Sequence, residues 1–379
     1  MKALTETAYI LPVYARQDLT LVRGEGTRVF DSEGRGYLDF LAGIAVVGLG
    51  HCHPGPLAAA RAQLGRLWHV SNLYWTEPMA SLAERLSNRF GGAQAFFCNS
   101  GAEAVEAGLK YARKATGKPG VVALEGSFHG RTLGALSVTG QPAKRAAFEP
   151  LLPEVAFAEP NDPVSLEAAV GPDTGCIVLE PVLGEGGVRP LDVAFVAGAR
   201  ELADETGAVL LFDEVQCGVG RTGTFFAWEG LGVRPDAVTL AKGLANGLPI
   251  GCLLVADGAP EGLAPGDHAS TFGGNPVTCA AASAVCDELT DELLAAVDAN
   301  GRALMARLAD LPHVVDVRGA GLLLGVELDR AAAPVVRECA AHGLLVGTAG
   351  EHVLRLTPPL VVTRPEIDEA LTVLAEVLA

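Results

Sequence analysis

Lys242 stands where a charged side chain is costly. It follows the apolar run AVTLA and precedes GLANGLPIG. The chain has six lysines, and the other five have polar or helical surroundings that predict surface positions: Lys2, Lys110, Lys114, Lys118 and Lys144. Burial penalises an unpaired ammonium and lowers its pKa, and a partly neutral amine is the form that attacks an aldehyde to make a Schiff base. The alternative is a strand-end lysine that reaches water or pairs with a carboxylate.

A second constellation begins at Asp213, which ends the apolar run AVLLF and precedes Glu214, Val215 and Gln216. Ligands of open α/β sheets bind at the carboxyl ends of strands. A pyridine nitrogen held against a buried carboxylate stays protonated, which makes pyridoxal phosphate an electron sink. Taken alone, Asp213 is equally well explained as a cap or turn residue. With Lys242 at the end of the next strand, it indicates a cofactor site.

A phosphate site is predicted directly after the apolar run AFFC, at Asn99-Ser100-Gly101-Ala102-Glu103. Ser100 and Glu103 form a capping-box pattern for a helix that runs to Thr116 and stops at Gly117. The Gly101 and Ala102 N–H groups, the Ser100 hydroxyl and the helix dipole favour a dianionic phosphate. Capping alone also explains this segment.

Two other patterns are set aside. Gly218–Gly223 matches G-x-G-x-x-G, a pattern that in a dinucleotide site joins a strand tightly to a helix. Here residues 214–217 separate it from the strand that ends at Asp213, and TFFAW follows instead of a helix start, which argues against a dinucleotide site. His51, Cys52 and His53 are adjacent in a Gly/Pro loop, which does not give the spaced tetrahedral set that zinc needs. The eight cysteines are scattered singly and are predicted to be buried free thiols.

Charge and composition exclude several function classes. The chain has 379 residues, 49% of them hydrophobic, and a net charge of -17, so it lacks the basic surface that nucleic acid or an anionic membrane needs. No apolar run is long enough for a membrane span, and the first ten residues lack the layout of a signal peptide. These observations predict a globular cytoplasmic protein.

The elements that position these residues alternate between short β-branched runs and helical segments, which predicts an α/β fold with a mostly parallel, buried sheet. A long helical stretch at 280–311 begins a different texture, with β-like runs at 321–328 and 343–346 and a terminal helix from about Pro365. We expect an N-terminal segment (1–45) that packs with the small domain, a large domain (46–275) and a smaller α+β C-terminal domain (276–379). The predicted strands of the large domain are 95–98, 121–124, 155–158, 176–180, 208–213, 237–241 and 251–255.

In this combination the chain resembles the class III pyridoxal-phosphate-dependent aminotransferases of fold type I. The resemblance covers nearly the whole chain, in the family's order: GEGTRVFDSEGRGYLDFLAGIAV, GLGHCHP, FFCNSGAEA, FHGRTLGALSVTG, LEPVLGEGGV, LLFDEVQCGVGRTG, TLAKGLANGLPIG, STFGGNP and LRLTPPL.

The resemblance implies roles for the residues around the cofactor. Lys242 is implied to be the catalytic lysine that forms the Schiff base, and Asp213 the partner of the pyridine nitrogen. Gln216 is implied to bond the ring hydroxyl. The remaining implied cofactor contacts are stacking and ring contacts by Phe128 and Val215, phosphate contacts by Ser100, Gly101 and Ala102, and a phosphate contact from the neighbouring subunit by Thr271.

The resemblance also implies how substrates bind. Arg131 is implied to bind the carboxylate distal to the reacting amine, and Arg355 the α-carboxylate of glutamate or 2-oxoglutarate. Glu185 is implied to be a gate that pairs with Arg355 when an ω-amine is bound and leaves it for glutamate. Ser270 is implied to touch the acylated substrate. Because Thr271 completes a neighbouring site, a homodimer is expected.

Within the family, the resemblance implies transfer of the amino group of N2-acetyl-L-ornithine to 2-oxoglutarate. The products are N-acetyl-L-glutamate 5-semialdehyde and L-glutamate, a step of arginine biosynthesis. The alternative amines are ornithine, succinylornithine, 4-aminobutyrate and carrier-protein-bound lysine precursors. A cofactor-binding module without catalysis is disfavoured by the intact Lys242 and Asp213. The chain departs from the family at Val47, often Asn, and at 244–246, often Gly-rich.

Overall fold

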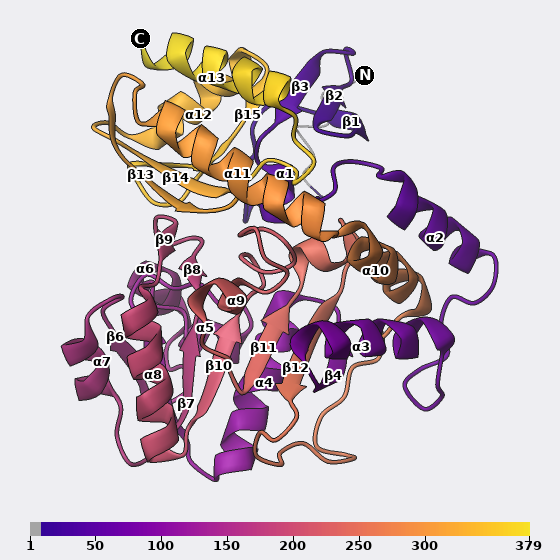
Figure 1. The fold of residues 1–379 in the computed structure, drawn as a ribbon, viewed down its shortest axis with the longest axis vertical. Coiled ribbons are helices and arrows are strands. Elements are labelled where there is room, and N and C mark those ends of the chain that lie inside the picture. Colours follow the sequence, from indigo (N-terminus) through magenta and orange to yellow (C-terminus); the bar gives the residue numbers. More distant parts are fainter. Residues whose placement is uncertain (1–8) are drawn as a thin grey trace.

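The computed structural model describes residues 9–379 (Figure 1). Its centre is a seven-stranded sheet with the order β4-β12-β11-β10-β7-β5-β6, in which only β12 runs antiparallel to its neighbours. This confirms the predicted mostly parallel sheet. All seven predicted strands are in it, with small shifts at their ends: β4 Ala93–Cys98, β5 Gly120–Leu124, β6 Val155–Ala158, β7 Thr174–Leu179, β10 Val209–Asp213, β11 Ala237–Leu240 and β12 Gly251–Ala256.

The central strands are mostly apolar and buried because helices cover both faces of the sheet. Alternate residues of β10 enter different clusters: Leu211 packs with α4 (Gly101–Thr116), whereas Leu210 and Phe212 pack with α8 (Val193–Thr206). All five residues of β10 are buried. The same two-sided covering holds the carboxyl ends of β10 and β11 in a fixed position.

Helix α4 has the predicted boundaries. The Ser100 hydroxyl accepts a hydrogen bond from Glu103 N at 3.2 Å, and the Glu103 carboxylate accepts one from Asn99 N at 2.7 Å. The helix stops at Gly117, which adopts the left-handed conformation with φ of 68°. The capping pattern therefore fixes where the N-terminus of α4 lies relative to β4.

The C-terminal part differs from the sequence prediction at two places. The predicted single stretch at 280–311 is two helices, α10 (Pro276–Glu288) and α11 (Asp291–Leu308), because Thr290 caps a new helix by accepting from Leu293 N at 3.3 Å. Strand β13 (Val314–Ala320) was not predicted, since it is half exposed and carries Asp316 and Arg318. It belongs to a sheet with β14 (Leu323–Leu328), β17 (Val353–Leu356) and β16 (Gly347–Thr348).

The N-terminal strands form a sheet with a C-terminal strand. Strands β1 (Leu21–Glu25), β2 (Arg28–Asp31) and β3 (Gly36–Asp39) are antiparallel, and β3 pairs with β15 (Leu344–Leu345). Figure 1 shows these strands beside α12 (Ala332–Ala341) and α13 (Arg364–Leu378), at the opposite end of the molecule from α7 and α8. This pairing joins residues 21–39 to a strand from the C-terminal part of the chain.

The Gly/Pro loop that holds His51, Cys52 and His53 ends where α2 begins at Pro54, with His53 as the cap. The prediction for the cysteines needs one correction. Cys52 is exposed, whereas the other seven cysteines are buried free thiols as predicted.

No helix within residues 9–379 has the length and apolar character needed to span a membrane. Further elements connect the layers. They are α1 Ala42–Ala45, α2 Pro54–Leu64, α3 Glu77–Phe90, α5 Leu133–Ser137, α6 Pro142–Arg145, α7 Pro163–Ala169, β8 Val182–Leu183, β9 Arg189–Pro190 and α9 Ala227–Leu231, with short 3-10 turns η2 Ala146–Phe148 and η3 Lys242–Ala245.

Candidate active site

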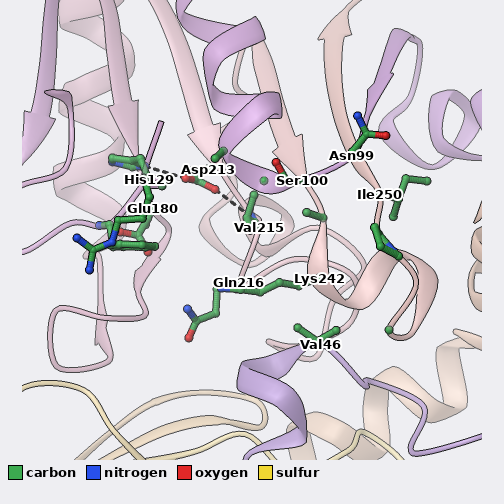
Figure 2. Close-up of a pocket in the computed structure, with 18 of the residues that line it drawn as sticks. Val46, Asn99, Ser100, His129, Glu180, Asp213, Val215, Gln216, Lys242 and Ile250 are labelled. Carbon is green, nitrogen blue, oxygen red and sulfur yellow. Dashed lines mark hydrogen bonds and ion pairs between the residues drawn. The ribbon is translucent and has the colours of Figure 1, made fainter. Parts of the chain in front are cut away.

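A cavity of about 420 Å³ opens at the carboxyl ends of β10 and β11 (Figure 2). Its walls come from the loop after β4, the segment around Phe128, the residues after Asp213, and the turn that begins at Lys242. Nine of the predicted site residues line it: Ser100, Gly101, Ala102, Phe128, Arg131, Asp213, Val215, Gln216 and Lys242. The cavity volume is in the range of small-molecule sites.

Lys242 begins η3, two residues beyond the end of β11. Its φ of 39° is one that residues other than glycine rarely adopt. Such backbone strain concentrates at functional sites. Burial lowers the pKa of the Lys242 amine, while the Glu185 carboxylate raises it and Arg355 lowers it again. The result favours a partly neutral amine inside the cavity, the state that nucleophilic or general-base chemistry requires.

Asp213 is buried and held on three sides. Its Oδ1 accepts from Val215 N at 3.0 Å and from the Thr239 hydroxyl at 3.1 Å, and its Oδ2 lies 2.7 Å from His129 Nδ1. Burial alone would lower the pKa of His129, but the bond and the charge of Asp213 raise it. Both oxygens of the Asp213 carboxylate are thus held by neighbouring groups. Figure 2 shows this pair side by side on the wall of the cavity.

Sequence reasoning missed His129. It lies within FHGRTL, but a single histidine between an aromatic residue and glycine gives no spacing that points to Asp213. The two residues meet only because the segment after β5 and the end of β10 converge in the fold, 84 positions apart in sequence.

The N-terminus of α4 provides an anion site in the cavity wall. The N–H groups of Gly101 and Ala102 begin the helix and have no partner within it. A Cβ at Gly101 would lie 2.7 Å from Val215 Cγ1, so only glycine allows the helix start to approach the residues after Asp213 this closely. A helix of 16 residues that begins here favours negative charge.

Arg355, on β17, is buried and surrounded by oxygen atoms. It forms an ion pair with Glu185 and donates to Gln216 Oε1 at 3.1 Å and to Gly184 O at 3.2 Å. Burial alone would raise the pKa of Glu185, but the Arg355 charge and hydrogen bond lower it. The pair lies beside the cavity, and Gln216 connects it to the cavity wall.

Glu180 joins two of the segments around the cavity. Its carboxyl oxygens accept from Phe128 N at 2.7 Å and from Gly184 N at 3.1 Å. Burial raises the pKa of Glu180 to about 7, with the nearby His129 acting in the opposite direction. Glu180 therefore holds the Phe128 loop and the Glu185 loop in contact with each other.

Phe128 carries two cations on its ring. The Arg131 guanidinium carbon lies 5.7 Å from the ring centroid, and the Lys144 ammonium nitrogen lies 4.6 Å from it. Both contacts have cation–π geometry. Lys144, predicted from the sequence to be a surface lysine, is half-buried here, because α6 packs back on the loop that carries Phe128.

Four predicted site residues do not line this cavity. Glu185 and Arg355 form the adjacent ion pair. Ser270 Oγ accepts from Asn99 Nδ2 at 3.0 Å and from Gly273 N at 3.1 Å, so it packs behind the loop after β4. Thr271 is exposed on the outside of the molecule. It is Val46, rather than Val47, that lines the cavity.

The loop at 218–223 has no dinucleotide geometry. It forms turns after β10, and the next helix, α9, begins only at Ala227. Arg221 within it is buried and donates to Leu322 O and Pro358 O, which ties the large and C-terminal parts together. Its glycines serve this packing.

The fold and this site define an aminotransferase, and the chain belongs to the class-III aminotransferase family, whose model matches residues 12–378. Within that family it is similar to the acetylornithine aminotransferase of Archaeoglobus fulgidus, with 46% identity over 370 residues that cover 97% of this chain and 98% of that protein. It is equally similar to the acetylornithine aminotransferase of Corynebacterium efficiens, with 46% identity over 385 residues, 98% of this chain and 95% of that protein.

Solved structures of two relatives have the same fold over nearly the whole chain. The N-acetylornithine aminotransferase of Stenotrophomonas maltophilia matches with a TM-score of 0.84 and 37% identity, covering 96% of each chain. The ornithine aminotransferase of Toxoplasma gondii matches with a TM-score of 0.93 and 32% identity, covering 98% of this chain and 92% of that one. In a crystal of the latter, pyridoxal phosphate partly occupies the active site.

Proposed function

We propose that this chain is a pyridoxal-phosphate-dependent transaminase that converts N2-acetyl-L-ornithine and 2-oxoglutarate to N-acetyl-L-glutamate 5-semialdehyde and L-glutamate. The observation that carries the proposal is the meeting, in one cavity, of a buried lysine, a buried carboxylate and a helix N-terminus, each from a different part of the sequence. The acetylornithine aminotransferases to which the chain is similar support the choice of amine.

The cavity fits the cofactor. Gly101, Ala102 and Ser100 would hold its phosphate, Phe128 and Val215 would lie against its ring, and Asp213 would face its ring nitrogen. The Asp213 carboxylate accepts three hydrogen bonds and retains lone-pair capacity for a further donor. When bound, pyridoxal phosphate supplies an electron sink for the electrons released at the substrate carbon.

Lys242 is proposed to hold the cofactor and then to move the proton. Its amine would hold the cofactor, and the free amine would act as the general base at the substrate carbon that bears the amine. Burial lowers the pKa of Lys242, which increases the neutral fraction of the amine that this step requires. Asp213, positioned by its bond to His129, would stabilise the positive charge of the ring nitrogen.

Two arginines are proposed to sort the substrates. Arg131 would bind the carboxylate distal to the reacting amine, and Arg355 the α-carboxylate of glutamate or 2-oxoglutarate as a planar fork. The Glu185–Arg355 ion pair is the state expected for an ω-amine substrate, since it cancels the charge of Arg355. For glutamate, Glu185 would leave Arg355. Ser270, which accepts a hydrogen bond from Asn99, is proposed to touch the acylated substrate.

A homodimer completes the proposed site. Exposed aromatic and aliphatic side chains gather beside Thr271, because two contacts hold the segment after Thr271 against residues 68–69. The ring centroids of Phe272 and His69 lie 5.4 Å apart, and Asn275 Nδ2 donates to Trp68 O at 2.9 Å. Contiguous exposed apolar patches mark interaction sites. The exposed members of this patch are Trp68, Leu73, Tyr74, Trp75 and Phe272. Buried against a second copy, they would bring Thr271 to the partner's phosphate site.

Sedimentation tests the dimer. Trp75→Glu places a charge at a side chain that is 88% exposed in the single chain, and we expect a monomer with weakened cofactor retention. Val193→Glu, on the exposed face of α8, is the matched control and should remain dimeric. A wild-type monomer that retains the cofactor would contradict the proposal.

We also propose that the chain divides near residue 275 into a large and a small domain. The proposed function further includes a cytoplasmic location.

A half-reaction panel tests the amine. The cofactor absorbance of the holoenzyme is followed after separate addition of N-acetylornithine, ornithine, succinylornithine, 4-aminobutyrate and glutamate. We expect fast loss with N-acetylornithine and glutamate only. Reaction with glutamate but not with N-acetylornithine would keep the aminotransferase and move the ω-amine to another compound of the panel or to a carrier-bound amine.

A further inference from the structure

Lys144 is a cation at the edge of the proposed site with no carboxylate of its own. Its ammonium lies 4.6 Å from the centroid of the Phe128 ring, and within residues 9–379 it forms no ion pair. Lys114, by contrast, pairs with Asp267 on the surface. A half-buried ammonium without a counter-ion is costly, so a position like this calls for a partner that arrives in another state.

The segment that carries Lys144 and the loop that carries Glu185 both contact the chain around Gly126. Gln141 Nε2, at the start of α6, donates to Gly126 O at 3.1 Å and to Ser127 O at 3.3 Å. The Gly126 segment in turn touches the Glu185 loop, since a Cβ at Gly186 would lie 2.6 Å from Gly126 O. The Glu180 carboxylate accepts hydrogen bonds from Phe128 N and Gly184 N, which ties the same two loops together. Lys144 and Glu185 therefore lie on two segments that are held to the same intervening loop, residues 126–128.

Charge links the two side chains in both directions. Burial lowers the pKa of Lys144, and among the nearby charges Glu185 raises it most. Lys144 is also one of the cations that lower the pKa of Glu185, after Arg355 and Lys242. The Glu185 side chain is 23% exposed, whereas Arg355 is only 3% exposed, so Glu185 has an open side toward which to move.

We propose that Lys144 is the second binding position of the Glu185 carboxylate: Glu185 pairs with Arg355 when an ω-amine is bound, and with Lys144 when a dicarboxylate occupies Arg355. The inference rests on the proposed function and assigns Lys144 a positioning role in substrate specificity. A carboxylate that left Arg355 with no second cation beside it would lose its charge partner. Lys144 removes that penalty, so it favours binding of glutamate and 2-oxoglutarate without touching them.

Binding of two inert ligands tests this without turnover. Glutarate carries two carboxylates and must displace Glu185 from Arg355, whereas N-acetylnorvaline carries one carboxylate and no ω-amine and leaves the pair intact. Titration calorimetry on the holoenzyme gives Kd for the wild type, Lys144→Met, Lys144→Arg, Glu185→Gln and the double variant Lys144→Met/Glu185→Gln. Methionine keeps an unbranched stem against Phe128 and removes the charge, while arginine keeps the charge.

We expect Lys144→Met to raise the Kd of glutarate about five- to tenfold and to leave that of N-acetylnorvaline within about twofold, with Lys144→Arg close to the wild type. In the Glu185→Gln background the effect of Lys144→Met on glutarate should disappear, because no carboxylate needs the second position. An undiminished effect in that background, an equal effect on both ligands, or no effect on glutarate would overturn the proposal. If the wild type binds neither ligand, the proposed function fails instead.

Discussion

The charge of Glu185 offers the sharpest perturbation of the account. The Glu185→Gln change keeps the shape of a side chain that contacts Arg355 and removes its negative charge. Arg355 retains its bonds to Gln216 and Gly184, so its position should hold. The substitution therefore isolates the electrostatic part of the proposed gate.

The magnitude follows from the burial of the pair. A hydrogen bond to a charged group contributes about 1.5–3 kcal/mol, and a neutral one about 1 kcal/mol. Arg355 is 3% exposed and Glu185 23% exposed, so solvent screens the pair only partly. Glutamate therefore has about 1–2 kcal/mol less to displace in the variant, which corresponds to roughly 5–30-fold tighter binding. The ω-amine half-reaction should weaken, because Arg355 is left as an uncompensated cation next to an incoming ammonium.

Single-turnover kinetics measure both sides of this prediction. The rate of cofactor absorbance loss is recorded against the concentration of N-acetylornithine and, separately, of glutamate. Glu185→Asp, which keeps the charge, is the control. Glu185→Gln should lose kcat/KM for N-acetylornithine, while its KM for glutamate falls. Equal losses in the two half-reactions would refute the gate.

Two further predictions concern stability. Phe226→Ala should lower the free energy of unfolding by about 3–5 kcal/mol, because Phe226 is fully buried against Phe90 and Phe225. In denaturant titrations the control Val193→Ala, at an exposed position, should stay within about 0.5 kcal/mol of the wild type. A similarly small loss for both variants would contradict the packing. Burial raises the pKa of Glu214 to about 8, above the ordinary value of 4.5, so its contribution to stability is full below pH 4.5 and is lost as the pH rises through 8. Urea unfolding at pH 6, 7 and 8 should therefore show a steeper loss for the wild type than for Glu214→Gln, and parallel curves would be the contrary result.

Most of the sheet was predictable because its strands are buried on both faces. Runs such as VLLF and CIVL are apolar throughout, and turn residues lie near their ends, so pattern alone locates them. Strand β13 was missed because it lies at the edge of its sheet and carries charged side chains. The break between α10 and α11 was missed because a single threonine cap interrupts an otherwise continuous helical pattern.

The candidate site was predictable where chemistry is unusual for its position. Lys242 was found because a lysine is rare after an apolar strand, and Ser100 because of its capping pattern. His129 and Lys144 were missed, since each gains its role from a partner far away in sequence: Asp213 for the first, and Phe128 with the Glu185 loop for the second. Thr271 illustrates the remaining gap, because its proposed partner is on another copy of the chain.

The most direct test of the central claim is to locate the cofactor on the chain. Borohydride reduction of the holoenzyme fixes pyridoxal phosphate covalently to the amine that holds it, and peptide mass spectrometry then identifies that amine among the six lysines. The account predicts a single modified peptide containing Lys242, and no modification in Lys242→Ala. Attachment at another lysine, or persistence of the label in Lys242→Ala, would contradict the account.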